Sequence, residues 1–381
     1  MTARSHPEVA PAYQGGEHGI PSSLMGRKLK LVISDLHLGK GTYREDGSVN
    51  VFEDFRSDGK FAEFLDYHRS GEHAEDEVEL IVNGDFFNLL SVDLDGRLNV
   101  AITERVAVEK TAAIIRGHPV AFEALQRFAN AEGHAVVFIM GNHDPGFLFA
   151  GVREVVTAAV GGKHAYVLDS YDFDGVHVEH GMQHEPMNAF NTQRYFVERN
   201  GELSLNLPLG SRYIIEVLNG EKALRPYIDK VAPFRRYFLW ALVNDPAIVF
   251  KITAKSFDFA LRALLKKIPH VDEVSPTEII ERLVLYTAFP TLEREAKHLL
   301  TRRGFNTVIM GHTHVPLYRE YARDKVYINT GTWNPMTSLD MGNFGRTEVL
   351  TYAHVDWVEG RPRARLREWR GLHRPAEDVF F

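Results

Sequence analysis

The chain has 381 residues, enough for one large domain or two smaller ones with an ample core. Hydrophobic residues make up 44% and charged residues 25%, as in ordinary globular proteins, and the net charge of −7 argues against a general nucleic-acid-binding protein. The absence of cysteine excludes disulfides and thiolate metal sites, so a metal ion would need ligands such as His, Asp or Asn.

Residues 1–27 contain Pro, Gly and Ser without hydrophobic periodicity, and we expect a flexible lead. This segment has no apolar stretch of the kind that secretory signals contain. No apolar run in the chain approaches the roughly 20 residues that span a bilayer. These observations together predict a cytoplasmic protein.

Six runs of strand-like sequence follow, and each ends in polar or glycine-containing sequence. They are 28–33, 78–82, 135–140, 176–179, 307–310 and 325–328. Helical periodicity lies between them, for example at 52–69 and 121–131. This alternation of strands and helices predicts an α/β fold with a layered sheet.

Side chains that can bind metals follow five of these predicted strands. Asp35 and His37 are two residues apart, as are His312 and His314, so each pair points to one side of its strand. Gly311, just before the second pair, predicts a tight turn of the backbone. The candidate metal ligands are Asp35, His37, Asp85, Asn142, His180, His312 and His314. In such sheets, bound molecules and ions lie beyond the carboxyl ends of the strands. We therefore expect the metal site there.

This mixture of oxygen and imidazole ligands suits Mn²⁺, Fe or Zn²⁺ better than Ca²⁺. Seven ligands are too many for one tetrahedral ion, and suffice for two divalent ions if one carboxylate bridges them. Two ions roughly 3.5–4 Å apart can hold a hydroxide for in-line attack on phosphorus and neutralise the attacking and leaving oxygens. His143, next to Asn142, is placed to protonate the leaving oxygen as a general acid.

The five motifs together resemble those of the calcineurin-like metallophosphoesterase superfamily, in the same order. They are Asp35-Leu36-His37, Gly84-Asp85, Gly141-Asn142-His143-Asp144, His180-Gly181 and Gly311-His312-Thr313-His314. The resemblance covers roughly residues 28–185 and 300–355. It implies a four-layer α/β/β/α sandwich, with a dinuclear metal site at the strand ends, and a phosphoric ester hydrolase.

The resemblance also assigns a role to each position. One metal would be held by Asp35, His37 and His314, and the second by Asn142, His180 and His312. Asp85 would bridge the two ions. His143 and Asp144 would form the proton-donating pair.

Departures from the family pattern narrow the class of enzyme. The second motif continues to Asn88, where many relatives have a second Asp, and it lacks the continuation typical of Ser/Thr protein phosphatases. The opening 34–39 is similar to that of UDP-2,3-diacylglucosamine hydrolases, but Met182 stands where those enzymes usually have Asp. The similarity of the opening makes a lipid-linked or nucleotide pyrophosphatase the alternative enzyme. A catalytically silent scaffold with the same fold is the non-enzyme alternative.

Between the fourth and fifth motifs the strand pattern gives way to helical signals, with helix starts at Asp245-Pro246 and at Ser275-Pro276. We define residues 187–290 as the insertion and expect it to be a helical cap. The predicted segments are a lead (1–27), the first part of the phosphoesterase domain (28–186), the insertion (187–290), the second part (291–360) and a peripheral tail (361–381).

The insertion differs from the rest of the chain in charge. Residues 221–270 contain ten Lys/Arg and four Asp/Glu, a net charge of +6, against −13 for the rest. One interpretation is a basic, apolar cap that recognises an anionic, amphiphilic phosphoester substrate or contacts a membrane or lipid. The other is a helical subdomain whose aromatic residues form its own core. We expect no stable nucleic-acid complex, and the sequence leaves the oligomeric state open.

Overall fold

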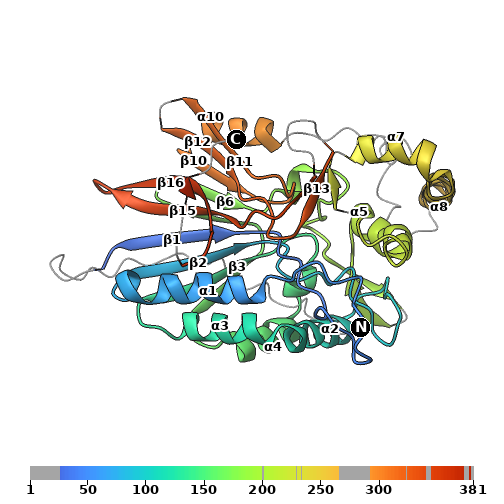
Figure 1. The fold of residues 1–381 in the computed structure, drawn as a ribbon, viewed down its shortest axis with the longest axis horizontal. Helices are drawn as coiled ribbons and strands as arrows, with labels where there is room; N and C mark the ends of the chain where they lie inside the picture. The colour runs from blue at the N-terminus through green and yellow to red at the C-terminus, as the bar shows by residue number, and fades with distance from the viewer. Residues whose placement is uncertain are drawn as a thin grey trace, which may run out of the picture.

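The structure, a computed structural model, describes residues 26–199, 201–228, 230–232, 234–265, 292–322, 324–339, 345–372 and 377–378. Two β-sheets pack face to face, and helices cover the outer face of each sheet (Figure 1). The prediction of a four-layer α/β/β/α sandwich is therefore confirmed.

The first sheet contains seven strands in the order β17-β16-β15-β1-β2-β3-β4. Their bounds are Glu377–Asp378 (β17), Arg361–Glu368 (β16), Thr351–Val358 (β15), Lys28–Ile33 (β1), Glu77–Asn83 (β2), His134–Ile139 (β3) and His164–Val167 (β4). Strands β1 to β4 run parallel, and β15 joins β1 antiparallel. The carboxyl ends of β1, β2 and β3 thus reach the same edge.

The second sheet contains five strands in the order β11-β12-β10-β6-β5. Their bounds are Leu317–Ala322 (β11), Lys325–Asn329 (β12), Thr307–Met310 (β10), Val176–Glu179 (β6) and Ser170–Phe173 (β5). Strands β6, β10 and β12 are parallel. Aliphatic side chains such as Val32 and Ile81 of the first sheet meet Val178 and Ile309 of the second. Because these strands are buried on both faces, the sequence shows them as continuous apolar runs.

Four helices cover the outer face of the first sheet, and one covers the second (Figure 1). They are α1 (Asp58–Arg69), α2 (Glu104–Gly117), α3 (Pro119–Ala129), α4 (Ala150–Val160) and, on the second sheet, α10 (Leu292–Arg302). The predicted helix 52–69 forms only from Asp58. Glu53 instead accepts hydrogen bonds from the backbone N–H groups of Gly39 (3.0 Å) and Gly41 (2.6 Å), which holds residues 52–57 as a loop beside the chain that follows β1.

The prediction of a peripheral tail from residue 361 is wrong for its first part. Strand β16 pairs with β15 along its whole length. Ala364 and Leu366 point into the core between the sheets, while the alternating Arg363 and Arg365 are more exposed. The density of arginine in this segment conceals a period of two that is typical of a strand with one buried face.

The described part of the insertion is not purely helical, because it begins with a β-hairpin. Its elements are β7 (Phe196–Arg199), β8 (Glu202–Leu205), α5 (Leu209–Tyr213), a π-helical turn (Ile214–Leu218), α6 (Asn219–Lys222), β9 (Val231–Ala232), α7 (Phe234–Asn244) and α8 (Pro246–Leu264). The predicted helix start at Asp245-Pro246 is confirmed, since the Asp245 side chain caps α8 by accepting the N–H of Ile248. The predicted start at Ser275 lies outside the described residues.

A small sheet joins the insertion to the second part of the phosphoesterase domain. It has the order β14-β13-β9, with β13 at Met336–Ser338 and β14 at Gly345–Thr347. Tyr237 and Ala241 of α7 pack on Ile248 and Ile252 of α8, in an apolar cluster of the insertion itself.

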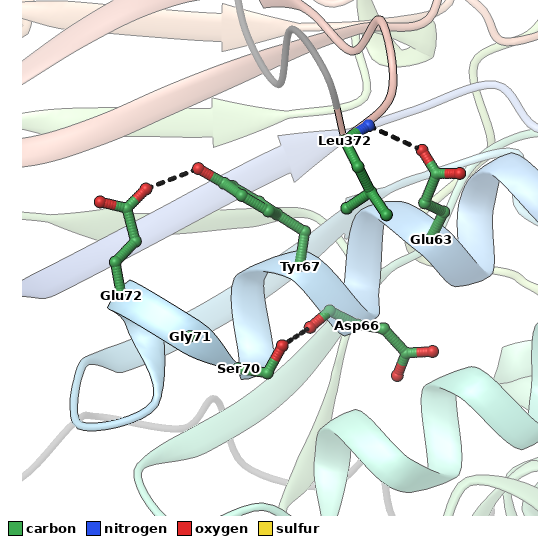
Figure 2. A pocket seen from close by; sticks show the side chains of 7 residues that line it. All are labelled: Glu63, Asp66, Tyr67, Ser70, Gly71, Glu72 and Leu372. Atoms are coloured by element: carbon green, nitrogen blue, oxygen red, sulfur yellow. Dashed lines mark hydrogen bonds between the residues drawn. The ribbon is translucent and has the colours of Figure 1, made fainter.

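A cavity of about 330 Å³ lies beside the end of α1 (Figure 2). It is lined by Glu63, Asp66, Tyr67, Ser70, Gly71, Glu72 and Leu372. Its polar groups already bond to one another, as Tyr67 donates to Glu72 (2.6 Å) and the N–H of Leu372 donates to Glu63 (3.1 Å). The cavity lies where the chain enters β2, at the opposite end of that strand from Asp85. We assign it no role in the metal site.

A buried imidazole ties the start of α3 to the loop that precedes α1. His118 contacts Asp58 through Nδ1 (2.9 Å) and Glu53 through Nε2 (3.2 Å), and only 1% of its side chain is exposed. Burial disfavours the charged imidazole, but the hydrogen bonds to Asp58 and Glu53 outweigh it and raise the pKa of His118 to about 9.

This raised pKa predicts how stability depends on pH. The contribution of His118 is fully present below its unfolded pKa of about 6.5 and is lost as the pH rises through about 9, a change on the order of 3 kcal/mol. Urea unfolding between pH 6 and pH 9.5 should show this decrease. A His118→Asn variant should be less stable near pH 6.5 and should approach the wild type at pH 9.5. An unchanged pH dependence in the variant would contradict the assignment.

Candidate metal centre

All seven predicted ligands lie in the described part of the chain and follow the carboxyl ends of five strands. Asp35 and His37 follow β1, Asp85 follows β2, Asn142 follows β3, His180 follows β6, and His312 and His314 follow β10. The first five are buried, and the two last histidines are partly buried. Both sheets thus deliver side chains to one end of the sandwich.

Two groups of these side chains could each hold a metal ion, and they share one residue. Asp35, His37, Asp85 and His314 form one group, and Asp85, His180 and His312 form the other. Within each group the potential ligand atoms lie within 4.8 Å of one another. In the first group, Nε2 of His37 and Nε2 of His314 are 3.0 Å apart. Asp85 belongs to both groups.

The carboxylate of Asp85 is oriented by the turn after β3. Its Oδ1 accepts the backbone N–H of His143 (2.7 Å). Its Oδ2 lies 3.3 Å from Nε2 of His180 and 3.7 Å from Nε2 of His37, which belong to the two different groups. One oxygen of Asp85 therefore faces both groups.

The two oxygens of the Asp35 carboxylate also have different surroundings. Its Oδ2 accepts hydrogen bonds from the Ser34 hydroxyl (2.5 Å) and from the backbone N–H of His312 (2.9 Å). Its Oδ1 has no hydrogen-bond partner and lies 3.3 Å from Nε2 of His314. The first oxygen anchors the side chain, and the second is available to a cation.

Three buried polar atoms at this site lack hydrogen-bond partners: Oδ1 of Asp35, Oδ1 of Asn142 and Nε2 of His180. Leaving such a group unsatisfied costs about 1–3 kcal/mol. The other ring nitrogen of His180, Nδ1, contacts the carbonyl oxygen of Asn83 at 2.9 Å. Nε2 is therefore the nitrogen that is left for a metal ion. Two carboxylates, an amide oxygen and imidazole nitrogens are the donors that Mn²⁺, Fe or Zn²⁺ accept, so these residues fit divalent metal ions.

The electrostatics of the site favour cations. Burial opposes ionisation of Asp35 and Asp85, but nearby histidines, above all His180, hold the pKa of both carboxyl groups below the ordinary value. Burial likewise disfavours a charged His180, but Asp85 and Asp35 outweigh it and raise the pKa of His180 to about 10, so a metal ion would displace a proton from Nε2. Two buried carboxylates therefore stay ionised in close proximity, and their charge attracts a cation.

Backbone strain is concentrated at the ligands. Nine non-glycine residues of the described chain have positive φ, and five of them are predicted ligands. These are Asp35 (55°), His37 (51°), Asp85 (53°), His312 (69°) and His314 (60°). Each such conformation costs about 1–3 kcal/mol and is found mainly at functional sites. The strain turns the side chains at the strand ends toward one point.

Gly311 has a different role from the one that the sequence predicts. It is not among the residues with positive φ, so it does not supply a left-handed turn. A Cβ at this position would instead lie 2.4 Å from Oγ of Ser34 and 2.5 Å from Oδ2 of Asp35. Gly311 is required because the β10 end passes directly against the Asp35 carboxylate.

The structure does not bring the predicted pair of His143 and Asp144 together through their side chains. The carboxylate of Asp144 accepts the backbone N–H groups of Gly141 (2.5 Å) and Phe86 (2.8 Å), so it braces the two turns after β2 and β3. Burial and the nearby charge of Asp85 raise the pKa of Asp144 to about 7. Nδ1 of the His143 ring instead lies 2.9 Å from Oδ1 of Asn88.

His143 itself lies beside the first group of ligands. Its ring packs edge-on against His37, with 4.5 Å between the ring centroids. With Nδ1 bonded to Asn88, Nε2 is the nitrogen that remains for a proton exchanged with another molecule. The structure thus brings His143 to the site but not Asp144 to His143.

Sequence reasoning missed Glu185, which contacts a predicted ligand directly. Its carboxylate accepts a hydrogen bond from Nε2 of His312, and Nδ2 of Asn188 donates to the same Glu185 oxygen at 2.7 Å. A carboxylate on one imidazole nitrogen fixes the tautomer and leaves the other nitrogen, here Nδ1 of His312, for a metal. The signal in the sequence was that the usual Asp of His-Gly-Asp is missing after His180, while an acid, Glu185, follows shortly afterwards.

Comparison with known protein families identifies one that matches this chain. A model of the calcineurin-like phosphoesterase family matches residues 30–316. No curated protein matches the chain. Among solved structures, a predicted phosphoesterase from Streptococcus pneumoniae TIGR4 is similar at 9% identity and a TM-score of 0.29, covering 93% of this chain and 98% of that one.

Two structures of Vps29 from Entamoeba histolytica are also similar. A single mutant shows 11% identity and a TM-score of 0.29, covering 93% of this chain and 99% of that one. The wild type in complex with Zn²⁺ shows 9% identity and a TM-score of 0.26, covering 92% and 98%. The family match spans most of this chain, including all five motifs. The chain therefore belongs to the calcineurin-like phosphoesterase family.

Proposed function

We propose that this protein is a metal-dependent phosphoester hydrolase with two divalent metal ions. The observation that carries this proposal is the Asp85 carboxylate, one oxygen of which faces two separate groups of buried ligands. Family membership supports phosphoester chemistry in general. We propose Mn²⁺ as the preferred metal, with Fe or Zn²⁺ as alternatives, because the donors combine carboxylate, amide and imidazole.

In this proposal, Asp35, His37 and His314 would hold the first ion, Asn142, His180 and His312 would hold the second, and Asp85 would be shared by both. Two bound ions would activate water and neutralise charge on the attacking and leaving oxygens. The residues around them have separate tasks. Ser34 and the His312 backbone fix the Asp35 carboxylate, and Glu185 fixes the His312 ring. In its imidazolium form, His143, whose Nδ1–H is bonded to Asn88, would donate the Nε2 proton to the leaving oxygen and become neutral.

Replacing Asp85 tests the proposed metal centre. The wild type should bind two Mn²⁺ per chain and hydrolyse bis(p-nitrophenyl) phosphate, and chelation should abolish turnover. Asp85→Ala should bind fewer ions and lose more than about 100-fold in kcat, beyond the effect typical of residues that only support ligands. Asp66→Ala, which removes a surface carboxylate on α1, is the control.

Metal content by elemental analysis and turnover on a phosphoester panel measure this outcome. Full activity of Asp85→Ala would refute the proposed metal-dependent hydrolysis. Two bound ions with no turnover on any phosphoester would instead favour a catalytically silent scaffold.

A lipid-linked phosphoester is the second candidate substrate class, and an exposed apolar surface on the insertion favours it. We name this surface the α7–α8 face. It comprises Leu239, Trp240, Leu242 and Val243 of α7 with Phe250, Phe257 and Leu261 of α8. Val243, Phe250 and Phe257 are 81%, 77% and 70% exposed. Figure 1 places both helices at the periphery of the molecule. Large apolar surfaces of this kind mark sites of interaction.

The basic charge of the insertion supports this candidate less than the sequence suggests. Of the basic residues in 221–270 whose side chains the structure describes, six lie in ion pairs. Lys251 and Lys255, for example, both contact the buried carboxylate of Glu221. No helix of the described chain combines the length and apolar character needed to cross a membrane. We therefore propose contact with acyl chains through the α7–α8 face rather than a mainly electrostatic attraction.

Removing two exposed aromatic rings tests this second candidate. Phe250→Ser/Phe257→Ser should lower the turnover of a detergent-solubilised glycolipid diphosphate by about tenfold or more, because each ring would lose an apolar contact of about 1.5–3 kcal/mol. Hydrolysis of bis(p-nitrophenyl) phosphate should not change. Equal turnover of the glycolipid by variant and wild type would exclude a role of the α7–α8 face in substrate binding.

A further inference from the structure

A line of buried contacts runs from the insertion to the ring of His143. Nδ1 of His143 contacts Oδ1 of Asn88 (2.9 Å), and Nδ2 of Asn88 donates to Oδ2 of Asp54 (3.2 Å). Lys222, the last residue of α6, donates to both oxygens of Asp54 at 2.8 Å, and Lys230 lies 2.7 Å from Oδ1. Asn88 and Asp54 belong to the phosphoesterase domain, and both lysines belong to the insertion.

The charged side chains of Asp54 and Lys222 are buried, so breaking their contact is costly. The side chains of Asp54 and Lys222 are 8% and 2% exposed, and Asn88 is 2% exposed. Breaking such a pair leaves an uncompensated charge in a poorly solvated place, at a cost of about 3–5 kcal/mol. Burial opposes ionisation of Asp54, but the two ammonium groups hold its pKa well below the ordinary value. Asp54 is therefore a carboxylate that can only accept hydrogen bonds.

An acceptor at this position decides which way the Asn88 amide points. The NH₂ group must face the Asp54 carboxylate, because the reverse orientation would set the amide oxygen against a negative charge. The carbonyl oxygen then faces His143, where it accepts a hydrogen bond from Nδ1–H. This places the ring in the tautomer with Nε2 free for exchange.

The same short helix of the insertion holds the loop that carries Asn88. Nδ2 of Asn219 donates to the carbonyl oxygen of Leu90 (2.9 Å), and the hydroxyl of Ser91 donates to Oδ1 of Asn219 (3.1 Å). Asn219 and Lys222 are the first and last residues of α6. The loop of the second motif is thus connected to α6 in two ways, directly to Asn219 and through Asp54 to Lys222.

We propose that Asp54, clamped by Lys222 and Lys230 of the insertion, is a positioning residue that orients the Asn88 amide and thereby the proton donor His143. This inference rests on the proposed phosphoester hydrolysis. The neutral Asn88 replaces the second Asp that many relatives have, and the negative charge lies one residue further from the ring. The insertion thereby sets the geometry of the proton transfer in addition to covering the site.

Leaving-group dependence tests the proposal, since only a poor leaving group needs a proton. p-Nitrophenolate leaves as a stable anion, whereas phenolate is more basic and benefits from protonation. The two substrates are bis(p-nitrophenyl) phosphate and diphenyl phosphate, which are similar in size and charge. The variants are Asn88→Leu, of similar volume without hydrogen-bonding groups, and Lys222→Met, of similar length without charge. Lys255→Met, which alters another paired lysine of the insertion, is the control.

Asn88→Leu should lower kcat for diphenyl phosphate by about 10- to 100-fold, part of the 10²- to 10⁴-fold that general acids contribute. For bis(p-nitrophenyl) phosphate, kcat should stay within about threefold, and KM should change little for either substrate. Lys222→Met should show the same selectivity to a smaller extent because Lys230 remains. Lys255→Met should leave the ratio of the two rates unchanged.

Metal content and thermal unfolding of each variant accompany the kinetics. If Lys222→Met does not fold, Lys230→Met, which removes the more exposed of the two lysines on Asp54, replaces it and should show the same selectivity. An equal loss for both substrates, or no loss for either, would overturn the positioning role while the proposed function stands. A wild type that cleaves neither ester would refute the proposed function and this inference with it.

Discussion

Two groups of polar side chains share one carboxylate and meet at the carboxyl ends of the parallel strands of two mixed sheets. Asp85 supplies that carboxylate. Its Oδ1 is bonded to the backbone of His143, so Oδ2 faces His37 and His180. Burying this charge among unsatisfied ligand atoms is unfavourable unless cations compensate it. The left-handed backbone at five ligands and the close approach at Gly311 are local costs that the fold tolerates in order to form this arrangement.

The insertion is attached to this centre by buried polar contacts rather than by apolar packing alone. Lys222 and Lys230 neutralise Asp54, and α6 bonds the loop that carries Asn88. Its basic residues, which in the sequence suggest an anion-binding surface, are mostly engaged within the protein. The side of the insertion that faces solvent is instead apolar along the α7–α8 face. One part of the insertion thus contacts the loops of the candidate centre, and another part presents apolar side chains to solvent.

The sequence was sufficient for features that depend on neighbouring residues. Apolar runs that end in Asp, Asn or His identified the buried parallel strands and the candidate ligands, six of which the structure brings together in two groups. Features that depend on distant contacts were missed. Whether Asp144 or Asn88 meets His143 depends on how two turns pack against each other, and Glu185 reaches His312 only after β6 and β10 pair. Strand β16 was missed because its arginines conceal the alternation that buries Leu366.

The most direct test of the two-metal centre is a crystal structure of the protein with Mn²⁺, with the ions located by their anomalous scattering. The account predicts two peaks, roughly 3.5–4 Å apart, both in contact with Asp85. One should also contact Asp35 and the other His180. A single peak, or two peaks of which one lies away from Asp85, would contradict the shared carboxylate on which the account depends.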